Sequence, residues 1–399
     1  MQVPSGLWLV LAVGMMLRII RRGRGLDYAM AGFFSALATA THYQAAVVVF
    51  GILAAHLEAR RRENRPLLTA LADARIYIAG FVTVLTFVCA TPDAVLDPSQ
   101  TARGYELARA FTGQAGTCGW WYLLFRVMPD TLGIGLLIFL LLALVWVILR
   151  PRLGTLALLA LTAGNFVSLT VGHTALMYRY AINPLLVMAL FGGTFAADLI
   201  ALASNWLGNR YGISLAVGLA GLLLAPSLIS DLQLNRLLSQ SDTRTQARLW
   251  IEKHIPLEKR ILQLRIAKHI ALEKYTVQLT LIAATDYDPL WNSFGKPQLP
   301  GSYQLIPMED FGSLRANGIL WVLSDSLPGL VRYSPGPSDA EQKGLNSEAR
   351  LVLDINPIKG GAPMPVFDPN DAFYVPYQHI SSMRWPGPRI RIWRLNHIE

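Results

Sequence analysis

Long apolar runs fill the first 230 positions, whereas the later positions mix apolar and polar residues in short stretches. A helix needs roughly 20 residues to cross about 30 Å of hydrocarbon, and several of these runs have that length. The clearest is TLGIGLLIFLLLALVWVIL at 131–149. We therefore predict eight transmembrane helices, at 3–20, 27–42, 43–59, 76–92, 129–149, 153–172, 178–203 and 211–230.

Arginines follow the first, third and fifth predicted spans and precede the last. These residues are Arg18, Arg21, Arg22, Arg24, Arg60, Arg61, Arg62, Arg65, Arg75, Arg150, Arg152 and Arg210. Because basic residues are enriched in cytoplasmic loops, these alternate loops are predicted to face the cytoplasm. The opposite side then holds Arg103, Arg109, Arg126 and Arg179, together with the chain after residue 230.

The segment 27–59 is predicted to be a hairpin rather than one long helix. Arginine clusters flank both of its ends, so both ends are expected at the cytoplasmic side, with the turn at Thr41-His42-Tyr43. The first apolar run lacks the basic start and the small-residue cleavage site of a signal peptide. We therefore expect the N-terminus outside the cytoplasm and further helices upstream of Met1.

The composition fits a membrane part joined to a polar part. Hydrophobic residues make up 53% and charged residues 15% of 399 positions, which excludes a disordered chain. Two cysteines exclude a disulfide scaffold, and Cys89 and Cys118 either pair or remain free thiols. The net charge of +9 comes mostly from loop arginines of the first 230 residues, where it sets topology. No nucleic-acid partner is therefore predicted.

A second domain is predicted over 231–399. DTRTQARLWIEKHIP at 242–256 predicts a helix with Asp242 at its N-cap. Its expected apolar face consists of Ala247, Trp250, Ile251 and Ile255. Strand-like runs occur at 276–283, 318–324, 349–355 and 389–395. The predicted fold is thus a multi-pass α-helical membrane domain over 1–230 followed by an extracytoplasmic α/β domain.

Several polar side chains gather at the predicted outer membrane face. They are His42 at the hairpin tip, Asp93 and Asp97 in the loop 93–128, and His173 and Arg179 around the sixth and seventh spans. Such groups usually face a cavity, and two histidines with an arginine suit an anionic phosphate. Other interpretations stay open. His42 can cap a helix, Asp97-Pro98-Ser99 can form a turn, and Arg179 can extend to the membrane interface.

The long loop itself is open to two interpretations. Besides its aspartates it carries an amphipathic stretch at 101–112 and the aromatic cluster Trp120-Trp121-Tyr122. Long ordered loops are often functional, whereas an amphipathic helix with aromatic anchors lies in the membrane interface. The usual motifs of glycine-rich phosphate loops, zinc hydrolases and serine hydrolases are absent from the sequence.

Several further segments occur in an order and spacing found in one family. They are AGFFSALATATHYQAAVVVFGILAAHL at 31–57, VLDPSQ at 95–100, MPDTLGIGLLIFLLLAL at 128–144, HTALMYRYAINPLLVMAL at 173–190, DTRTQARLWIEKHIP at 242–256, DAFYVPY at 371–377 and PGPRIRIWRL at 386–395. Together they resemble the GT-C fold membrane glycosyltransferases of the protein O-mannosyltransferase and aminoarabinose-transferase type. The resemblance covers nearly the whole chain.

This resemblance implies transfer of a sugar from a polyprenyl-phosphate donor at the extracytoplasmic face. His173, Arg179 and Tyr180 lie in the segment similar to the family's donor site, and His42 stands where the family has a lysine. These four residues are expected to bind the lipid phosphate.

The resemblance also implies an acidic catalytic loop in preceding helices, and the chain has no counterpart of that loop. No catalytic residue is therefore assigned, and Asp93 and Asp97 are the candidates as available outer carboxylates. We expect a truncated or split form, whose N-terminal half would be a separate chain.

The expected setting is the cell envelope, as an integral protein of a bacterial inner or plasma membrane in contact with the lipid bilayer. The acceptor would be a glycan, a lipid or a protein, the last implying protein glycosylation. No cofactor and no metal-binding residues are predicted, and a role for a divalent metal is left open. The alternative function is a non-catalytic membrane protein that binds a lipid-linked sugar or a partner protein. A transporter is disfavoured because the spans carry few charges and show no inverted repeat.

Overall fold

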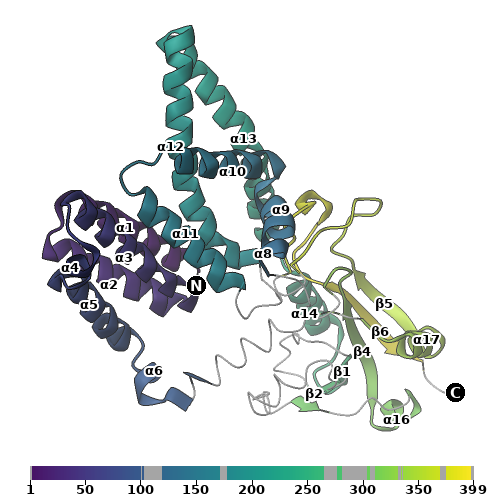
Figure 1. The fold of residues 1–399 in the computed structure, drawn as a ribbon. Helices are drawn as coiled ribbons and strands as arrows, with labels where there is room; N and C mark the ends of the chain where they lie inside the picture. The colour runs from purple at the N-terminus through teal and green to yellow at the C-terminus, as the bar shows by residue number, and fades with distance from the viewer. Residues whose placement is uncertain are drawn as a thin grey trace. The chain divides into compact units, whose positions relative to one another are not determined.

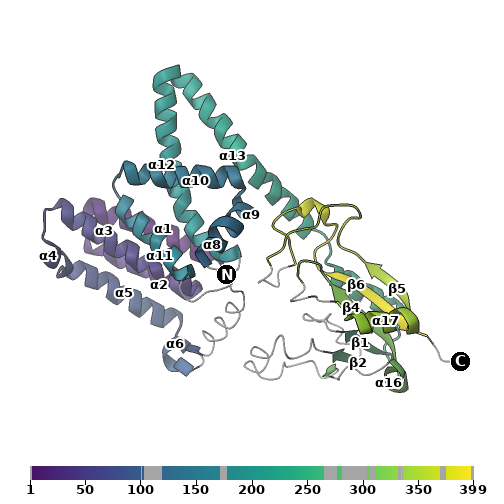
Figure 2. The same cartoon turned by 45° about the vertical axis from the view of Figure 1, so that its right-hand side comes forward.

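The structure is a computed structural model. It describes residues 2–99, 101–102, 119–170, 178–264, 276–280, 303–305, 311–330, 334, 336–368 and 374–396. The chain divides into two compact units, Met1–Pro226 and Ser227–Glu399. The first unit is helical, and the second contains a β-sheet (Figures 1 and 2).

Helices make up the described part of the first unit. They are α1 (Gln2–Arg22), α2 (Gly25–Thr41), the 3₁₀ turn η1 (Tyr43–Val47), α3 (Val48–Arg62), α4 (Leu67–Leu71), α5 (Ala74–Ala90), α6 (Asp93–Leu96), α8 (Gly119–Tyr122), the π-helical turn η2 (Leu123–Val127), α9 (Met128–Leu132), α10 (Ile134–Leu149), α11 (Thr155–Thr170), the 3₁₀ turn η3 (Tyr178–Ala181), α12 (Ile182–Leu207) and α13 (Asn209–Leu238). The boundary between the two units falls inside α13, at Pro226.

Helices α2 and α3 form the predicted hairpin. The Tyr28 hydroxyl and His56 Nδ1, equally distant in sequence from His42, lie 2.7 Å apart. Helix α1 runs antiparallel to α2, since the Ser5 hydroxyl donates a hydrogen bond to the Ala38 carbonyl near one end. The prediction of a turn at Thr41-His42-Tyr43 is confirmed, because α2 ends at Thr41 and His42 adopts an extended conformation.

Close helix approaches require small residues at two contacts. A Cβ on Gly32 of α2 would lie 2.4 Å from the Ala79 carbonyl oxygen of α5, so no larger residue fits there. A Cβ on Gly51 of α3 would lie 2.9 Å from the methyl group of Met16 in α1. Small residues let helix backbones approach closely, which is the usual way that membrane helices associate.

The alternating helix directions bring the loop arginines to one end of the first unit. The Arg75 guanidinium donates a hydrogen bond to the Gly23 carbonyl at 2.7 Å, and Glu58 accepts one from the Gly154 amide at 2.8 Å. We call this the arginine end. It contains Arg21, Arg22, Arg24, Arg60, Arg61, Arg62, Arg65, Arg75, Arg150 and Arg152. The opposite end holds the hairpin tip.

Helices occupy all eight of the predicted ranges, with two corrections. The predicted span 129–149 is not continuous, because Gly133 (φ +76°) separates α9 from α10 in a conformation that side chains disfavour. The predicted span 211–230 is too short, because α13 continues through Pro226 to Leu238.

Four helices among the described residues are long and apolar enough to cross a membrane. They are Pro4–Arg22, Leu67–Ala90, Ile182–Trp206 and the apolar part of Arg210–His254. Two apolar helices, Ile134–Leu149 and Thr155–Leu169, are shorter. These helices are compatible with a membrane protein, and the count of eight crossings stays a prediction.

The described part of the second unit combines helices with a six-stranded sheet. Its elements are α14 (Thr243–His254), β1 (Arg260–Leu264), β2 (Thr276–Thr280), β3 (Tyr303–Leu305), α16 (Phe311–Ala316), β4 (Ile319–Ser326), α17 (Asp339–Glu348), β5 (Ala349–Ile355), the 3₁₀ turn η5 (Ile380–Ser382) and β6 (Arg389–Leu395). The strand order is β3-β2-β1-β4-β6-β5, with β3, β2, β1 and β4 parallel and the other two pairings antiparallel (Figure 2).

The sequence patterns located α14 and four of the six described strands. The helix at 242–256 is confirmed as α14, with Asp242 as its N-cap and Ala247 and Ile251 fully buried. Strands β5 and β6 match their predicted ranges. Strand β1 was missed because four successive residues, 261–264, are buried on both faces and show no polar alternation.

Candidate functional site

The end of the first unit opposite the arginine end contains many aromatic side chains, and we call it the aromatic end. It is built from the hairpin tip with η1, from α8, η2 and α9, and from η3. Helix α11 packs against both η1 and α8, and η2 packs against η3. Segments far apart in sequence are therefore joined at this end.

His42 lies between two tyrosines. Its ring stacks on Tyr43 with 5.5 Å between centroids, and it meets Tyr180 edge to face at 5.6 Å. His42 caps α2 through its backbone, because its amide donates a hydrogen bond to the Ala38 carbonyl, whereas its side chain makes no capping bond to η1. Two of the four residues expected to bind phosphate, His42 and Tyr180, are thus brought together.

A second group at this end centres on Asp130. The Tyr178 hydroxyl donates a hydrogen bond to Asp130 Oδ2 at 2.6 Å, and Arg126 Nε lies 3.1 Å from the same oxygen. The Tyr122 ring packs edge to face against Tyr178. Arg126 belongs to the π-helical turn η2, a local irregularity that is frequent at functional sites. Its side chain is 57% exposed, so this cation remains accessible.

Sequence reasoning did not select Asp130, Tyr178 or Gln44 as site residues. Gln44, next to the hairpin tip, is 5% exposed, and its amide nitrogen has no hydrogen-bond partner in the described parts of the chain. A usable signal existed for Asp130, because a carboxylate at the start of the most apolar run needs a partner. No comparable signal marked Gln44, since its burial depends on tertiary packing.

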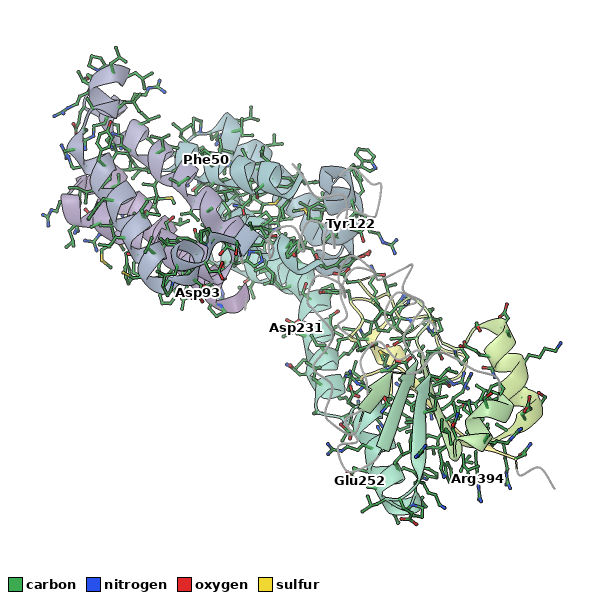
Figure 3. All side chains as sticks on the ribbon, turned by 90° about the horizontal axis from the view of Figure 1, so that it is seen from below. Phe50, Asp93, Tyr122, Asp231, Glu252 and Arg394 are labelled. Atoms are coloured by element: carbon green, nitrogen blue, oxygen red, sulfur yellow. The ribbon has the colours of Figure 1, made fainter. Side chains whose placement is uncertain are left out.

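The candidate catalytic aspartates lie in a different place. Asp93 is the first residue of the short helix α6, Asp97 follows its last residue, and both are exposed. The Ser99 hydroxyl donates a hydrogen bond to Asp97 Oδ1 at 2.6 Å, but Pro98 and Ser99 are helical, so these three residues do not form a simple turn. Figure 3 shows Asp93 well apart from Tyr122. The structure thus does not gather Asp93 with Tyr122, whose ring packs against Tyr178 in the Asp130 group.

Other predicted residues fall outside what the structure describes. His173 and Cys118 lie outside the described residues, as does most of the amphipathic stretch 101–112. Arg179 belongs to η3, but its side chain is not described. Cys89 is a free, exposed thiol. Within the described ranges, no group of three or more His, Cys, Asp or Glu side chains is placed to hold a metal ion.

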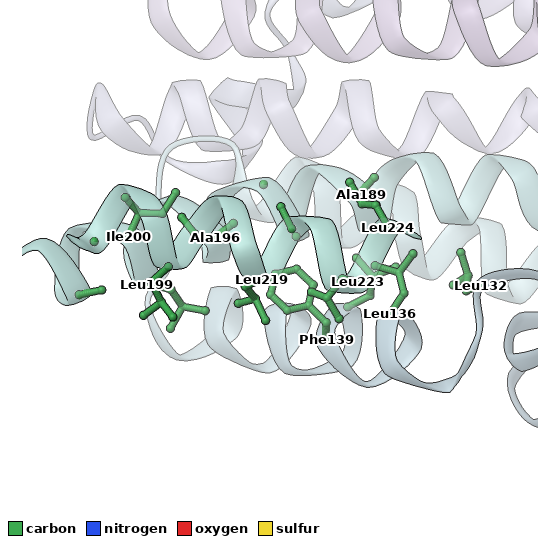
Figure 4. A pocket seen from close by; sticks show the side chains of 18 of the residues that line it. Leu132, Leu136, Phe139, Ala189, Ala196, Leu199, Ile200, Leu219, Leu223 and Leu224 are labelled. Carbon is green, nitrogen blue, oxygen red and sulfur yellow. The ribbon is translucent and has the colours of Figure 1, made fainter. Parts of the chain in front are cut away.

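An apolar cavity of about 440 Å³ lies between α10, α12 and α13 (Figure 4). Leucines of α10 and α13 form its walls, and small residues of α12 leave the space open. The lining includes Leu132, Leu136, Phe139, Leu185, Ala189, Gly192, Gly193, Ala196, Leu199, Ala203, Leu219 and Leu223. One end of the cavity, at Leu132, is two residues from Asp130. The cavity therefore begins beside the aromatic end and extends toward the other end of α12.

The second unit has a polar cluster of its own at the carboxyl end of β4. Asp325 is 2% exposed, and the Ser334 hydroxyl donates a hydrogen bond to its Oδ2 at 3.0 Å. The Tyr374 hydroxyl lies 3.1 Å from Ser334, and the Arg244 guanidinium lies over the Tyr374 ring. Asp325 Oδ1 has no hydrogen-bond partner among the described residues.

Burial dominates the electrostatics of this cluster. Desolvation raises the pKa of Asp325 to about 7, against smaller lowering effects of the Ser334 hydroxyl and the Arg244 charge. Desolvation also raises the pKa of Tyr374 to about 12. Arg244 stays charged because its hydrogen bonds to Asp242, at 2.8 and 2.9 Å, raise its pKa further. The cluster thus holds a carboxyl group that titrates near neutral pH.

Comparison with known proteins adds no assignment to this geometry. The chain matches no protein-family model and no curated protein sequence.

Proposed function

We propose that this chain is a membrane glycosyltransferase of the GT-C type, which transfers a sugar from a polyprenyl-phosphate donor to an acceptor at the extracytoplasmic face. The observation that carries the proposal is the position of the apolar cavity. It starts two residues from Asp130, beside a group of tyrosines and an exposed arginine. An amphipathic lipid has the same order of parts, with a polar head joined to a long apolar chain.

The dimensions of the cavity suit a prenyl chain. Its lining residues on α12 run from Leu185 to Ala203, which at 1.5 Å per residue is about 27 Å. That length is close to the roughly 30 Å thickness of the hydrocarbon core. Glycine and alanine residues on α12, opposite the leucines of α13, leave room for a prenyl chain, which makes no polar contacts. A prenyl chain would therefore gain its affinity from apolar burial along the whole cavity.

The polar head would lie at the aromatic end. In the proposed reaction the bond between the anomeric carbon of the sugar and the phosphate oxygen breaks, and the phosphate leaves with an additional negative charge. Arg126 and His42 would stabilise that charge, His42 as a hydrogen-bond donor. The acceptor forms the new bond to the anomeric carbon and loses its proton to a general base. Asp130, held by Tyr178 and Arg126, would position these two side chains rather than act as that base.

The position of Asp93 and Asp97 favours the alternative function. Both carboxylates are exposed, and Figure 3 shows Asp93 apart from Tyr122 at the aromatic end. A chain without a base near the phosphate would bind the lipid-linked sugar without transferring it. Binding and transfer therefore have to be measured separately.

Filling the cavity tests the proposal directly. A Cβ on Gly193 would meet no heavy atom within 4 Å, so Gly193→Phe projects its ring into the cavity without disturbing the packed core. We expect this variant to bind a labelled polyprenyl-phosphate sugar at least about tenfold more weakly, because less of the prenyl chain is then buried against apolar side chains. Gly218→Phe is the matched control, since Gly218 of α13 also has open space but does not line the cavity. Equal donor binding by the two variants would refute the cavity as the prenyl site.

Arg126→Gln tests the position of the head. The variant should bind polyprenyl phosphate less tightly, by roughly tenfold, because a charge-assisted contact to phosphate is lost. It should bind the uncharged polyprenol as the original chain does. Transfer of the labelled sugar to a mixed acceptor preparation then separates the two functions. Donor binding without any transfer, also in the presence of an added upstream segment, would support the non-catalytic alternative.

A further inference from the structure

We propose that the arginine end carries a binding site for an anionic phospholipid with a glycerol headgroup, separate from the polyprenyl site. A cavity of about 480 Å³ lies where the C-terminal turn of α3 meets the turn between α10 and α11. Arg61, Arg62 and Arg152 line it together with a single acidic residue, Glu58. Three positive charges against one negative charge favour an anionic ligand.

The arginines are available for such a ligand. The side chains of Arg61 and Arg62 are exposed and make no hydrogen bond or ion pair within the described ranges. Arg152 contacts Asp198, but more than half of its side chain remains exposed. A phosphate diester accepts hydrogen bonds from guanidinium groups, and arginine offers a planar fork that fits two of its oxygens. The cavity therefore has both the charge and the donor geometry for a phosphate.

Glu58 adds a feature that a bare phosphate would not use. One carboxylate oxygen accepts the Gly154 amide at 2.8 Å, which holds the start of α11 against α3. The other oxygen is buried without a hydrogen-bond partner among the described residues. A donor hydroxyl of a glycerol headgroup would satisfy this oxygen, since burying an unpaired carboxylate oxygen is unfavourable.

Apolar side chains complete the match to a lipid rather than a soluble anion. Ile148, Leu156 and Leu159 line the same cavity, and Ile148 and Leu156 are about half exposed. They belong to α10 and α11, the two shorter apolar helices. Acyl chains can lie against these residues while the headgroup reaches the arginines. Basic pockets at the cytoplasmic ends of membrane helices bind anionic lipid headgroups in this way.

Native mass spectrometry of the purified full chain in detergent tests the site, with phosphatidylglycerol or phosphatidylcholine added as the probe lipid. We expect the chain to retain phosphatidylglycerol in preference to phosphatidylcholine. The double variant Arg61→Gln/Arg62→Gln should lose this retention by about tenfold, because arginines near an anionic headgroup dominate its binding. Arg21→Gln/Arg22→Gln is the matched control, since it removes the same charge from exposed residues of the same end that do not line the cavity.

Three results would overturn the proposal. Equal losses in the two double variants would indicate diffuse attraction by the arginine end. Equal retention of the two lipids would indicate binding without recognition of the headgroup. Thermal stabilisation by inorganic phosphate as large as that by phosphatidylglycerol would indicate a soluble anion. Unchanged unfolding temperatures of both variants in lipid-free detergent establish that both are folded. The polyprenyl cavity is intact in these variants, so the result is independent of donor binding.

Discussion

Two buried ionisable side chains, one in each unit, show opposite ways to keep a charged group inside a protein. Arg60 of α3 is 1% exposed, and its Nη1 lies 2.7 Å from Glu63 and 3.5 Å from Asp73. Asp325 of β4 is 2% exposed, and the hydroxyl of Ser334 donates a hydrogen bond to it. The arginine is thus compensated by full opposite charges, whereas the aspartate is held by a neutral group.

The difference follows from the chemistry of the two side chains. Arginine cannot lose its proton in a protein, so its burial requires carboxylates at contact distance. Aspartate can become neutral, and burial without a contacting cation raises its pKa toward neutral pH. The ion pairs of Arg60 hold the end of α3 against the start of α5 at all ordinary pH values. The burial of Asp325 beside a neutral hydroxyl makes the stability of the second unit depend on pH.

Removing Arg60 should have the largest effect. Arg60→Ala leaves Asp73, whose side chain is 6% exposed, with only Arg75 and Arg65 as cations among the described residues, and breaking a buried ion pair by removing one partner costs up to about 5 kcal/mol. The unfolding temperature of the variant in detergent should fall accordingly. Arg22→Ala, an exposed arginine of the same end, serves as the control and should change little. A small effect of Arg60→Ala would mean that the contact between α3 and α5 does not depend on this charge.

Asp325→Asn should have an effect that depends on pH. Because the folded pKa, about 7, lies above the ordinary value, the folded state binds the proton more tightly than the unfolded state. The stability of the original chain should therefore fall as pH rises from about 4 to about 7 and level off above that. The variant should lack this fall and be more stable at about pH 8, by up to about 4 kcal/mol. Unfolding measured at about pH 5 and about pH 8 checks the sign, and parallel profiles of the two proteins would contradict it.

Ser334→Ala should have the smallest effect of the three. The variant loses the hydroxyl that donates to Asp325 and lies 3.1 Å from the Tyr374 hydroxyl, which costs about 1 kcal/mol. Since this hydrogen bond favours the ionised carboxylate, its loss should raise the pKa of Asp325 above 7. The fall in stability with pH should then extend to higher pH than in the original chain. Ser347→Ala, at an exposed hydroxyl of α17, provides the control.

The sequence located the helices well because their signal is local. Apolar runs and the arginines that follow them predicted helices at every range where the first unit has one of its long helices, and the hairpin tip at His42. The failures came from single residues with special backbone geometry or burial. Gly133 interrupts the most apolar run, and β1 is buried on both faces, so neither the run length nor the alternation revealed them.

The candidate site was also predictable only in part. Residue types near a membrane face suggested His42, and the family resemblance suggested Tyr180; the structure brings their ring centroids to 5.6 Å. It does not gather Asp93 with Tyr122, and it added Asp130, Tyr178 and Arg126, which sequence reasoning had left out. The pairing of Asp130 with Tyr178 joins residues 48 positions apart. No local pattern encodes such a contact.

The sequence by itself determined the two regimes of this protein: apolar helices with arginines at alternate ends, and a polar segment of mixed helices and strands. These properties depend on the free energy of transferring each segment from water to hydrocarbon and on the spacing of apolar residues within a few positions. The tertiary structure alone decided that the helix ends form an arginine end and an aromatic end, that a cavity opens between α10, α12 and α13, and that Asp325 is buried. Each of these depends on which distant segments pack together and so exclude water from a particular side chain.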